Sequence, residues 1–586
     1  MNYNLNDITA QQQKASTLSI LGKLLLLIKD ERQNLLLALT AILINSGLNL
    51  LNPFIVGYTI DKYIVHKNYY GVLMNAVLLV CMAVIAFGAS YTQTRMMGGV
   101  GQRMLFKLRN AVFTKLQELP VAFFNQNKAG DLISRINNDT DKINLFFSQS
   151  LMQFIGTIAT MVGAGIFLLA INFRLGLVTL LPGLMIFIFT KTTSQWVKRK
   201  NAVSLKTTGG LSAEIQESLN NFKVIIAFNR RDYFRKRFEE ANAKNYVAAK
   251  AAGISNNVFI PVYGFFASTA QLIVLTVGIY LISTGRFSIG LLVSYLSYAT
   301  NFYNPLRQLA ALWTNFQVAM AGSDRISHIL NLESNLPVVQ DNRKEKTAAL
   351  LEFRSIHFGY EGGEEILHNI NFSLEPGKTY ALVGPTGGGK TTTASLVARL
   401  YDPVSGQVLL KGKDIRAYET DERTRMIGFI LQEPFLFTGT VRDNILYGNE
   451  KFAGFSNDQL EEVIKNANLQ SLLAIFENGL DTHVSSGGES ISIGQKQLIA
   501  FMRAVLRNPD LLILDEATAN IDTMTEKILQ DILNKLPRET TRLIIAHRLN
   551  TIKNADEIYF VNAGEVIRAG SFDHAVNMLL QEKRVS

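Results

Sequence analysis

The sequence predicts a multi-domain protein in which an all-α transmembrane domain of six helices is followed by an α/β domain of the P-loop nucleotide-binding type. Its 586 residues suggest at least two domains, and only 18% of them are charged, which is low for a soluble protein of this length. Nearly all long apolar runs precede about residue 320. The glycine-rich segment Gly384–Thr391 then lies between a hydrophobic run and a helix-like segment, which is the context that a phosphate-binding loop requires.

Six segments are long and apolar enough to cross the hydrocarbon core of a bilayer, which takes roughly 20 residues. They are residues 34–60, 70–94, 151–171, 175–194, 257–282 and 288–313. We expect the polar side chains of the first and last spans to face a cavity or a neighbouring helix. The polar and aromatic residues of the last span suit an amphipathic cargo or, equally, the packing of helices against one another. These residues are Tyr295, Ser297, Tyr298, Asn301, Phe302 and Tyr303.

The distribution of basic residues predicts the orientation of the membrane domain. The connections 95–150 and 191–256 are long and rich in Lys and Arg, whereas the other three are short and hold few basic residues. By the positive-inside rule, both long connections are cytoplasmic. We therefore expect a multi-pass protein of the cell inner (cytoplasmic) membrane whose nucleotide-binding domain lies in the cytoplasm. The N-terminal residues 1–30 read as an interfacial helix region and not as a cleavable signal peptide.

Helical apolar spacing continues into both long connections, over residues 100–119 and 200–250. This spacing predicts membrane helices that extend into the cytoplasm and turn back there. Pro120–Phe124, followed by Gly130–Arg135 and Asp139, is one candidate contact with the nucleotide-binding domain, and Glu214–Phe222 is another. A solvated hairpin without a coupling role is the alternative.

The net charge of +10 is compatible with a nucleic-acid ligand or with a basic surface beside anionic lipids. The sequence contains no aromatic-basic recognition module, so we expect a lipid bilayer and no nucleic acid as a partner. Cys81 is the single cysteine of the chain, which excludes an intramolecular disulfide and a multi-cysteine metal cluster.

The phosphate-binding loop and the start of its helix predict a site for ATP and Mg²⁺. Backbone N–H groups can close around phosphate oxygens at the helix N-terminus, Lys390 supplies a positive charge, and the Thr391 hydroxyl can ligate magnesium. The residues expected to bind the nucleotide here are Gly384, Pro385, Thr386, Gly387, Gly388, Gly389, Lys390, Thr391 and Thr392.

Residues that follow other apolar strands complete this site. Asp515 ends the strand Leu511–Asp515, where a magnesium ligand is expected, and Glu516 beside it can orient or deprotonate an attacking water. Gln432 can reach both magnesium and that water, and His547 can bond the terminal phosphate and orient Glu516. This set predicts hydrolysis as well as binding of the nucleotide.

Tyr360 ends the segment Leu351–Tyr360, which alternates like an edge strand, and its ring can stack on adenine. Taken singly, a tyrosine, a glutamine or a histidine at a strand end says little. Their order and spacing along the chain make the combined interpretation specific.

The chain thus resembles a half-transporter of the ATP-binding-cassette (ABC) exporter family. Gly384–Thr391 matches the Walker A motif, Gln432 the Q-loop, Leu511–Glu516 the Walker B strand with its catalytic glutamate, Ala519–Asp522 the D-loop, His547 the switch histidine and Tyr360 the A-loop aromatic. The resemblance implies that Asp522 also belongs to the nucleotide site. It also implies that residues near 120–130 and 213–222 lie at or close to two coupling helices. The expected domains are residues 1–30, 31–325, a linker at 326–349, and 350–586.

The family's signature Leu-Ser-Gly-Gly-Gln is altered here. Ser492, Gly494 and Gln495 match it and are expected to face the ATP held by an opposite subunit, but Ile493 replaces the first glycine. A β-branched residue restricts the backbone there and is expected to keep it away from phosphate. Harmless drift is one interpretation of this change. The other is that the chain is the catalytic-glutamate subunit of a heterodimer with one degenerate ATP site.

The family resemblance further implies ATP-driven export of amphiphilic drugs or lipids by alternating access, with a second half-transporter as partner. A heterodimer is the favoured interpretation. The alternatives are a homodimeric lipid flippase and, from another class of protein, an ATP-gated membrane channel.

Overall fold

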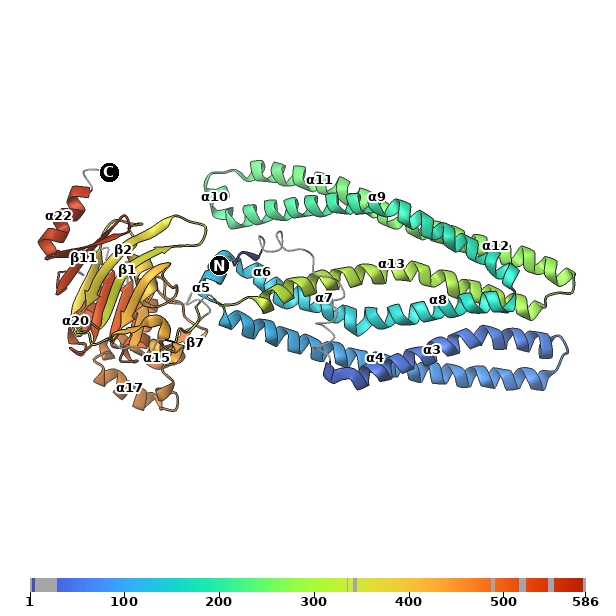
Figure 1. Ribbon diagram of the computed structural model, residues 1–586, viewed down its shortest axis with the longest axis horizontal. Helices are drawn as coiled ribbons and strands as arrows, with labels where there is room; N and C mark the ends of the chain where they lie inside the picture. Colours follow the sequence, from blue (N-terminus) through green and yellow to red (C-terminus); the bar gives the residue numbers. More distant parts are fainter. Residues whose placement is uncertain are drawn as a thin grey trace. The chain divides into compact units, whose positions relative to one another are not determined.

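The computed structural model describes residues 3–5, 29–334, 336–340, 345–485, 491–515, 523–545 and 553–582. The chain divides into two compact units. Residues 12–117 and 130–331 form the helical unit, and residues 1–11, 118–129 and 332–586 form the sheet unit. Figure 1 shows the elements of both units in sequence colours. The predicted interfacial helix region falls mostly on residues 6–28, outside the described residues.

The helical unit is built from long helices that lie along one another. They are α3 (Arg32–Thr59), α4 (Tyr69–Glu118), α8 (Leu151–Ile171), α9 (Phe173–Asn220), α11 (Arg231–Asn257), α12 (Phe259–Ser283) and α13 (Ile289–Asn331). Short elements connect them: η1 (Lys29–Glu31), η2 (Ile60–Ile64), α6 (Ala129–Ser134), η3 (Arg135–Asp139), α7 (Thr140–Leu145), η4 (Phe146–Ser150) and α10 (Phe222–Ala227). Helix α13 packs against α3, α8 and α12, and α3 also packs against α8.

Five helical segments in the described part of the chain are long and apolar enough to cross a membrane. They are Arg32–Ile64, Tyr69–Glu118, Ala129–Ile171, Phe173–Asn220 and Arg231–Ser283, and they contain the first five predicted spans. The sixth predicted span, 288–313, lies within α13, a helix of 43 residues that is not among these five. The predicted order, a helical membrane region followed by an α/β domain, is confirmed.

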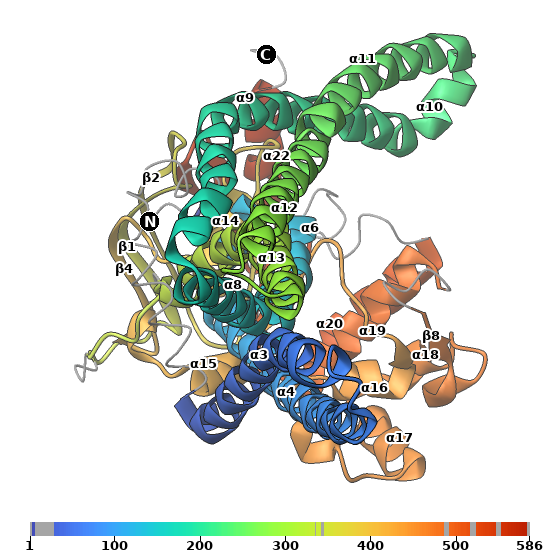
Figure 2. The same cartoon turned by 90° about the vertical axis from the view of Figure 1, so that its right-hand side faces the viewer.

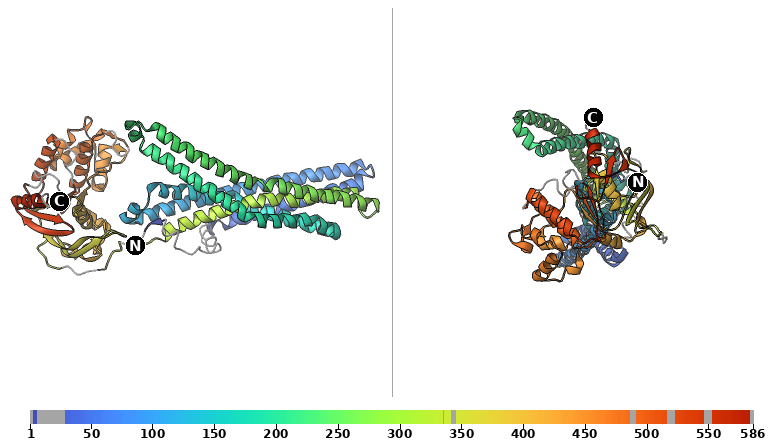
Figure 3. Two further views of the ribbon diagram at one scale, coloured as in Figure 1. Left: turned by 90° about the horizontal axis from the view of Figure 1, so that it is seen from above. Right: turned by 90° about the vertical axis from the view of Figure 1, so that its left-hand side faces the viewer.

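The helices of the membrane region extend far beyond the predicted spans. Helix α4 runs without interruption to Glu118, and α9 runs to Asn220. Figure 2 and Figure 3 show the hairpin of α9, α10 and α11 separating from the other helices of the helical unit, with α10 at its tip. The buried residues of α9 end at Ile186, and beyond them the side chains of α9 are exposed or half-buried although the helix packs against α11. The chain turns back between α9 and α11 through α10, which begins at Phe222. This residue is the last of the predicted segment Glu214–Phe222.

The tyrosines of the last span serve the packing of the helical unit and not a cargo site. Tyr295, Tyr298 and Tyr303 are buried, and their hydroxyls donate hydrogen bonds to backbone carbonyls of α8, α3 and α9 at 2.9, 2.6 and 2.5 Å. The Tyr298 ring also stacks on Phe167 of α8, with ring centroids 4.9 Å apart. Of the two interpretations that the sequence left open, helix packing is the one that the contacts support.

The sheet unit contains a six-stranded and a four-stranded sheet. The six-stranded sheet has the order β12-β11-β3-β10-β9-β6, and the other has the order β2-β1-β4-β5. The strands are β1 (Leu351–Gly359), β2 (Glu365–Leu374), β3 (Thr379–Val383), β4 (Ser405–Leu410), β5 (Lys413–Asp414), β6 (Ile427–Ile430), β9 (Leu511–Asp515), β10 (Thr541–Ile545), β11 (Glu557–Asn562) and β12 (Glu565–Gly570), and β7 (Gly439–Thr440) pairs with β8 (His483–Val484).

Helices cover both faces of the six-stranded sheet. The helical elements of this unit are α5 (Val121–Gln126), α14 (Lys390–Val397), η5 (Ile415–Ala417), α15 (Thr420–Met426), α16 (Val441–Leu446), η6 (Glu450–Phe452), α17 (Asn457–Asn466), α18 (Gln470–Leu473), η7 (Gly479–Asp481), α19 (Ile493–Val505), α20 (Thr523–Lys535) and α22 (Phe572–Glu582). One apolar core lies between the two sheets and includes α14, and a second joins β6 and β9 to α16–α20. Strands β11, β3, β10, β9 and β6 are parallel, and β12 is antiparallel.

The prediction that Leu351–Tyr360 forms an edge strand was wrong. Strand β1 pairs with β2 on one side and with β4 on the other. The alternation of apolar and polar residues in β1 shows only that one face of the strand is buried. In a sheet with one covered face, central strands and edge strands both have this alternation.

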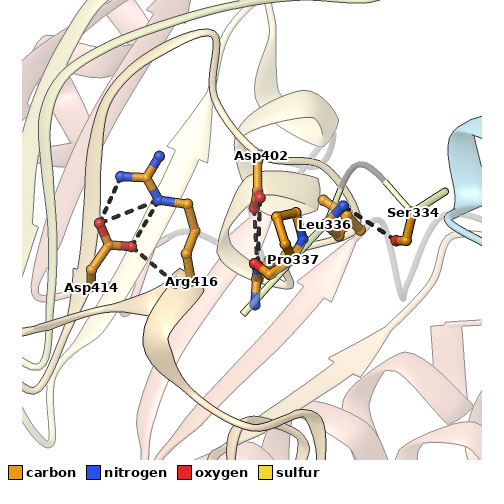
Figure 4. A network of polar contacts seen from close by, with 7 residues as sticks. Ser334, Leu336, Pro337, Asp402, Asp414 and Arg416 are labelled. Carbon is orange, nitrogen blue, oxygen red and sulfur yellow. Dashed lines mark hydrogen bonds and ion pairs between the residues drawn. The ribbon is translucent and has the colours of Figure 1, made fainter. Parts of the chain in front are cut away.

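The segment after α13 is bonded to the sheet unit (Figure 4). Within the segment, the backbone N–H of Leu336 donates to Ser334 Oγ at 3.2 Å. The buried Arg399 donates to the carbonyl of Pro337 at 2.7 Å and also binds Asp402. Val339 then donates to the carbonyl of Arg416 at 2.9 Å, and the side chain of Arg416 is held by Asp414. These bonds fix the chain before it enters β1.

Candidate nucleotide-binding site

The site lies at the carboxyl ends of the parallel strands. The phosphate-binding loop follows β3, Asp515 is the last residue of β9, and Gln432 follows β6 by two residues. Because β3, β10, β9 and β6 are parallel neighbours, their carboxyl ends meet at one edge of the sheet, which is where open α/β sheets bind ligands. Asp515 lies in register with Ile545, the last residue of β10.

The glycines of the loop are required by its backbone. Gly384 has φ +149°, and a Cβ on it would lie 1.9 Å from the carbonyl oxygen of Val561 in β11. A Cβ on Gly388 would lie 2.7 Å from the same oxygen. Gly389 has φ +109° and is the N-cap residue of α14. The first N–H groups of α14 have no intrahelical acceptors and point at the loop, which favours an anion there.

Lys390, the first residue of α14, is buried and bends back over the loop. Its Nζ donates hydrogen bonds to the carbonyl oxygens of Gly384 at 2.9 Å and of Pro385 at 2.7 Å. The ammonium group is therefore held at the mouth of the loop, where it can neutralise a phosphate.

Two of the predicted magnesium ligands meet in the structure. The Thr391 hydroxyl donates to Asp515 Oδ1 at 3.4 Å, and Asp515 is almost fully buried. A hydroxyl and a carboxylate are oxygen ligands of the kind that Mg²⁺ prefers, so these residues fit the ion. Among the described residues no group of three His, Cys, Asp or Glu side chains is placed to hold a metal. Gln432 is exposed at the same edge of the sheet.

Tyr360, the residue predicted to stack on adenine, lies beside the first turn of α14. It follows β1, its ring is 38% exposed, and its hydroxyl is 3.3 Å from Thr392 Oγ1. The ring packs edge-on against Phe358 and Tyr401, with centroid distances of 5.1 and 5.2 Å. A pocket of about 650 Å³ adjoins it. The exposed ring face is thus available to a base.

The same pocket is lined by α5, which belongs to the sheet unit. Asn125 of α5 donates a hydrogen bond to the Tyr401 hydroxyl at 2.7 Å. Burial raises the pKa of Tyr401, so its hydroxyl stays protonated at neutral pH. Asn125 directly follows the predicted segment Pro120–Phe124, and Ala122 within that segment lines the same pocket, so this part of the predicted contact is confirmed. The part at Gly130–Arg135 stays a prediction. Tyr401 was not singled out by the sequence, where nothing distinguishes it from other aromatic residues.

The N-terminal residues hold α5 from its other side. Tyr3 is fully buried, and its ring packs edge-on against Phe123 at 6.2 Å. Its N–H donates to Gln126 Oε1 at 2.7 Å, and its hydroxyl donates to the carbonyl of Glu333 at 2.9 Å. The orientation of α5 is therefore fixed by side chains on both sides.

Asp139, which was predicted to belong with this contact, is bound by a residue of α13. It lies in the helical unit, where Arg325 of α13 donates to both of its carboxylate oxygens at 2.7 and 2.6 Å. These bonds tie η3 to α13, and a part for Asp139 in the contact with the nucleotide-binding domain stays a prediction.

The altered signature forms the N-terminus of α19. Ser492 is the N-cap residue; its Oγ accepts from the N–H of Gln495 at 3.1 Å, and its own N–H donates to Gln495 Oε1 at 2.9 Å. Ile493 is the first helical residue and is 52% exposed, with Gly494 next to it. Ile493 has a helical backbone, and its expected effect on the distance between this backbone and phosphate stays a prediction. What Ile493 adds is an apolar side chain on the surface that presents the signature.

Three predicted site residues, Glu516, Asp522 and His547, lie outside the described residues. Each continues an element that is described or precedes one: Glu516 follows Asp515, Asp522 precedes α20, and His547 follows β10 by two residues. Their roles remain predictions from the sequence.

The fold and the loop define an ATPase of the P-loop class attached to a helical membrane region. Comparison with known families refines this class. The ABC transporter transmembrane region matches residues 35–306, and the ABC transporter nucleotide-binding model matches residues 367–519.

Relatives match over nearly the whole chain. An uncharacterised ABC transporter ATP-binding protein of Bacillus subtilis is 35% identical over 93% of this chain and 90% of the relative. A fatty acid ABC transporter ATP-binding/permease protein of Mycobacterium bovis is 32% identical over 82% of this chain and 76% of the relative. A multidrug resistance ABC transporter ATP-binding and permease protein of Lactococcus lactis is 32% identical over 85% of this chain and 84% of the relative.

The chain therefore belongs to the ABC transporter family, with the domain order of an exporter-type half-transporter. It is a multi-pass membrane protein with a cytoplasmic nucleotide-binding domain, and it couples ATP hydrolysis to transport.

Proposed function

We propose that this chain is the catalytic-glutamate subunit of a heterodimeric exporter that moves amphiphilic drugs or lipids out of the cell by alternating access. The main observation in favour of a heterodimer is that the two surfaces of this chain expected to contact ATP differ: the phosphate-binding loop is intact and the signature is altered. The phosphate-binding loop has every expected residue, and Thr391 and Asp515 are in contact. The signature surface instead presents the exposed side chain of Ile493 at the N-terminus of α19.

Two features support a second subunit. Each ATP site of this family is expected to combine one subunit's phosphate-binding loop with the other's signature. The hairpin of α9, α10 and α11 also exposes apolar side chains that one chain leaves uncovered. On α10 and its end, Phe222, Val224, Ile226 and Phe228 are each more than two-fifths exposed. Apolar side chains clustered in this way mark an interaction surface.

The chemistry follows from the residues around the loop. Backbone N–H groups at the start of α14 and the Lys390 ammonium bind the phosphates, while Tyr360 stacks on the base. Glu516 orients the attacking water, and Gln432 and His547 help to align it with the terminal phosphate. Thr391 and Asp515 would hold Mg²⁺, which supplies positive charge to the phosphate oxygens when bound.

ATP binding between the two subunits draws the membrane regions together and opens the cavity between them outward, and hydrolysis resets it. Amphiphiles are the proposed cargo because relatives are described as fatty acid and multidrug transporters. The polar residues of the helical unit are compatible with such molecules.

The test is to purify the full chain from membranes with and without a candidate partner half-transporter and to assay both in proteoliposomes. We expect amphiphile-stimulated ATPase activity and ATP-dependent export from the two-subunit complex, and weak activity from the chain alone. A homodimer with full, cooperative, amphiphile-stimulated ATPase activity would overturn the heterodimer. Conductance without stoichiometric ATP turnover would overturn export.

A further inference from the structure

A pocket of about 240 Å³ lies within the helical unit, between α3, α4, α8 and α13. Its lining is dominated by side-chain amides and hydroxyls, although the helices around it are apolar. The polar groups that carry the argument are those of Asn45, Asn49, Gln93, Gln153, Thr157 and Gln308.

The sequence places these groups on two facing stripes. Asn45 and Asn49 are one turn apart on α3, and Gln153 and Thr157 are one turn apart on α8, which packs against α3. At 1.5 Å per residue, Asn45 lies about 20 Å along α3 from Arg32, so the pocket is in the middle of the helix. Two polar stripes therefore face each other between these helices, and Gln93 and Gln153 lie within three residues of the cytoplasmic ends of the predicted spans 70–94 and 151–171.

Most of these polar groups lack a partner within the protein. Asn45 donates to Ser90 Oγ at 3.0 Å, and Asn49 donates to Asn45 Oδ1 at 3.3 Å. In the described part of the chain, the side chains of Gln93, Gln153, Thr157 and Gln308 make no hydrogen bond. Unsatisfied amides and hydroxyls are costly in hydrocarbon, so such groups face water or a polar ligand.

Thr157 differs in this respect from Thr92 and Thr269, two threonines that do not line the pocket. On α4 and α12, Thr92 and Thr269 donate their hydroxyls to the carbonyl one turn earlier, at 2.8 Å in both cases. Such a bond satisfies a hydroxyl that faces lipid. The Thr157 hydroxyl makes no such bond in the described structure and remains available to a ligand in the pocket.

The lining also contains no charged side chain among the described residues. A carboxylate or an ammonium group would enter this pocket between apolar helices without a counter-charge from its lining, which is unfavourable. Amides and hydroxyls both donate and accept hydrogen bonds, so they suit an uncharged polar group. The volume is below the roughly 300–1,000 Å³ of pockets that enclose whole drug-sized ligands, so it fits a head group and not an entire amphiphile.

We propose that this pocket is the subsite for the uncharged, hydroxyl- or amide-bearing head group of an amphiphilic substrate. The inference rests on the proposed export function and narrows its substrate class. It selects neutral amphiphiles over fatty acids and over cationic drugs, with the apolar tail left outside the pocket against the helices or the lipid.

The test compares three probes with one acyl chain: 1-monolauroylglycerol, laurate and lauroylcholine. Binding is measured on the full transporter, with whatever subunit it assembles with, in lipid nanodiscs, and empty nanodiscs correct for partitioning. We expect saturable binding of 1-monolauroylglycerol that is tighter than that of either ionic probe. Equal or tighter binding of laurate or lauroylcholine would overturn the proposed class.

Two variants locate the binding. Thr157→Val removes only the hydroxyl, and Gln153→Met removes the amide of an exposed side chain. Each is expected to weaken binding of 1-monolauroylglycerol about three- to tenfold, the loss of one hydrogen bond. Thr269→Val is the matched control and should bind as the wild type does. Unchanged binding in both pocket variants would overturn the subsite.

Transport separates this inference from the function on which it rests. Selective binding that depends on Thr157 and Gln153, without ATP-driven movement of any probe in proteoliposomes, would support the subsite and overturn export. ATP-driven export that is unaffected by both variants would support export and overturn the subsite.

Discussion

Asn125 Nδ2 lies 2.7 Å from the hydroxyl oxygen of Tyr401, and the ring of Tyr401 packs edge-on against Tyr360 at 5.2 Å. The side chain of Tyr401 therefore connects α5 to Tyr360, the residue expected to stack on adenine. Because α5 directly follows the membrane helix α4, this chain of contacts offers a route from a membrane helix to the nucleotide base.

We expect Tyr401→Phe to weaken the coupling of transport to ATP hydrolysis while preserving the site. The variant keeps the ring that supports Tyr360 and removes only the hydrogen bond to Asn125, which is worth about 1 kcal/mol. Basal ATPase activity should stay within about twofold of the wild type, and stimulation by an amphiphile should fall severalfold. ATPase assays in proteoliposomes with and without 1-monolauroylglycerol measure both quantities.

The control for this variant is Tyr418→Phe. The Tyr418 hydroxyl is also buried in the sheet unit and donates to the carbonyl of Leu410 at 2.7 Å, but it does not contact α5. Tyr418→Phe should lower the unfolding temperature slightly and leave stimulation intact. Equal loss of stimulation in both variants would show that Tyr401 acts through general stability.

A comparison of two glycines tests the phosphate-binding loop. Gly384→Ala would place a Cβ 1.9 Å from the carbonyl oxygen of Val561, and φ is +149° there, so the loop must move. Gly387 has φ +84° but open space around it, so Gly387→Ala should cost only about 1–2 kcal/mol of backbone strain. We expect ATP binding to be lost in Gly384→Ala and weakened in Gly387→Ala. Equal ATP affinities in a fluorescence titration would contradict this geometry.

The parts of the site that are local in sequence were predictable. The strand, loop and helix around Gly384–Thr391 follow from a contiguous segment, and the apolar run that ends at Asp515 identifies its strand. Their convergence follows from parallel pairing, because neighbouring carboxyl ends share one edge.

Pairings distant in sequence were not predictable from one chain. The contact between Asn125 and Tyr401 joins residues 276 positions apart, and neither residue has a distinctive sequence context. The central position of β1 depends on β4, which follows it after the phosphate-binding loop. The sequence of the tyrosine-rich stripe in α13 is the same whether these residues bind cargo or pack against other helices. Only the acceptors that their hydroxyls bond to distinguish these two roles.

Glu516→Gln is expected to abolish hydrolysis and retain ATP binding. The amide keeps the shape of the side chain but cannot accept a proton from water, and loss of a general base lowers the rate by about 10²–10⁴-fold. The complex should accumulate in a closed, ATP-bound state that a filter-retention assay with labelled ATP detects. Glu433→Gln is the control, since Glu433 is exposed in the loop after β6 and has no assigned role. Unchanged phosphate release in Glu516→Gln would refute the role of Glu516.

Ile493 can be tested with two substitutions that separate its bulk from its backbone. Ile493→Gly restores the family residue, whereas Ile493→Ala removes the side chain and keeps a strong helix former. Because Ile493 already has a helical conformation as the first residue of α19, the backbone freedom of glycine is not needed there. Alanine is also more favourable than glycine in a helix by about 1 kcal/mol.

We therefore expect both variants to tighten ATP binding at the composite site that this signature completes, with Ile493→Ala at least as effective as Ile493→Gly. Ile493→Ala and Ile493→Gly are each combined with Glu516→Gln, which prevents hydrolysis at the site that contains Glu516. The amount of ATP retained per complex then measures binding at the site that the altered signature completes. Tighter binding with Ile493→Gly alone would show that backbone freedom is the missing property. No change with either variant would mean that Ile493 is harmless drift, and the argument for a degenerate second site would then lose its basis.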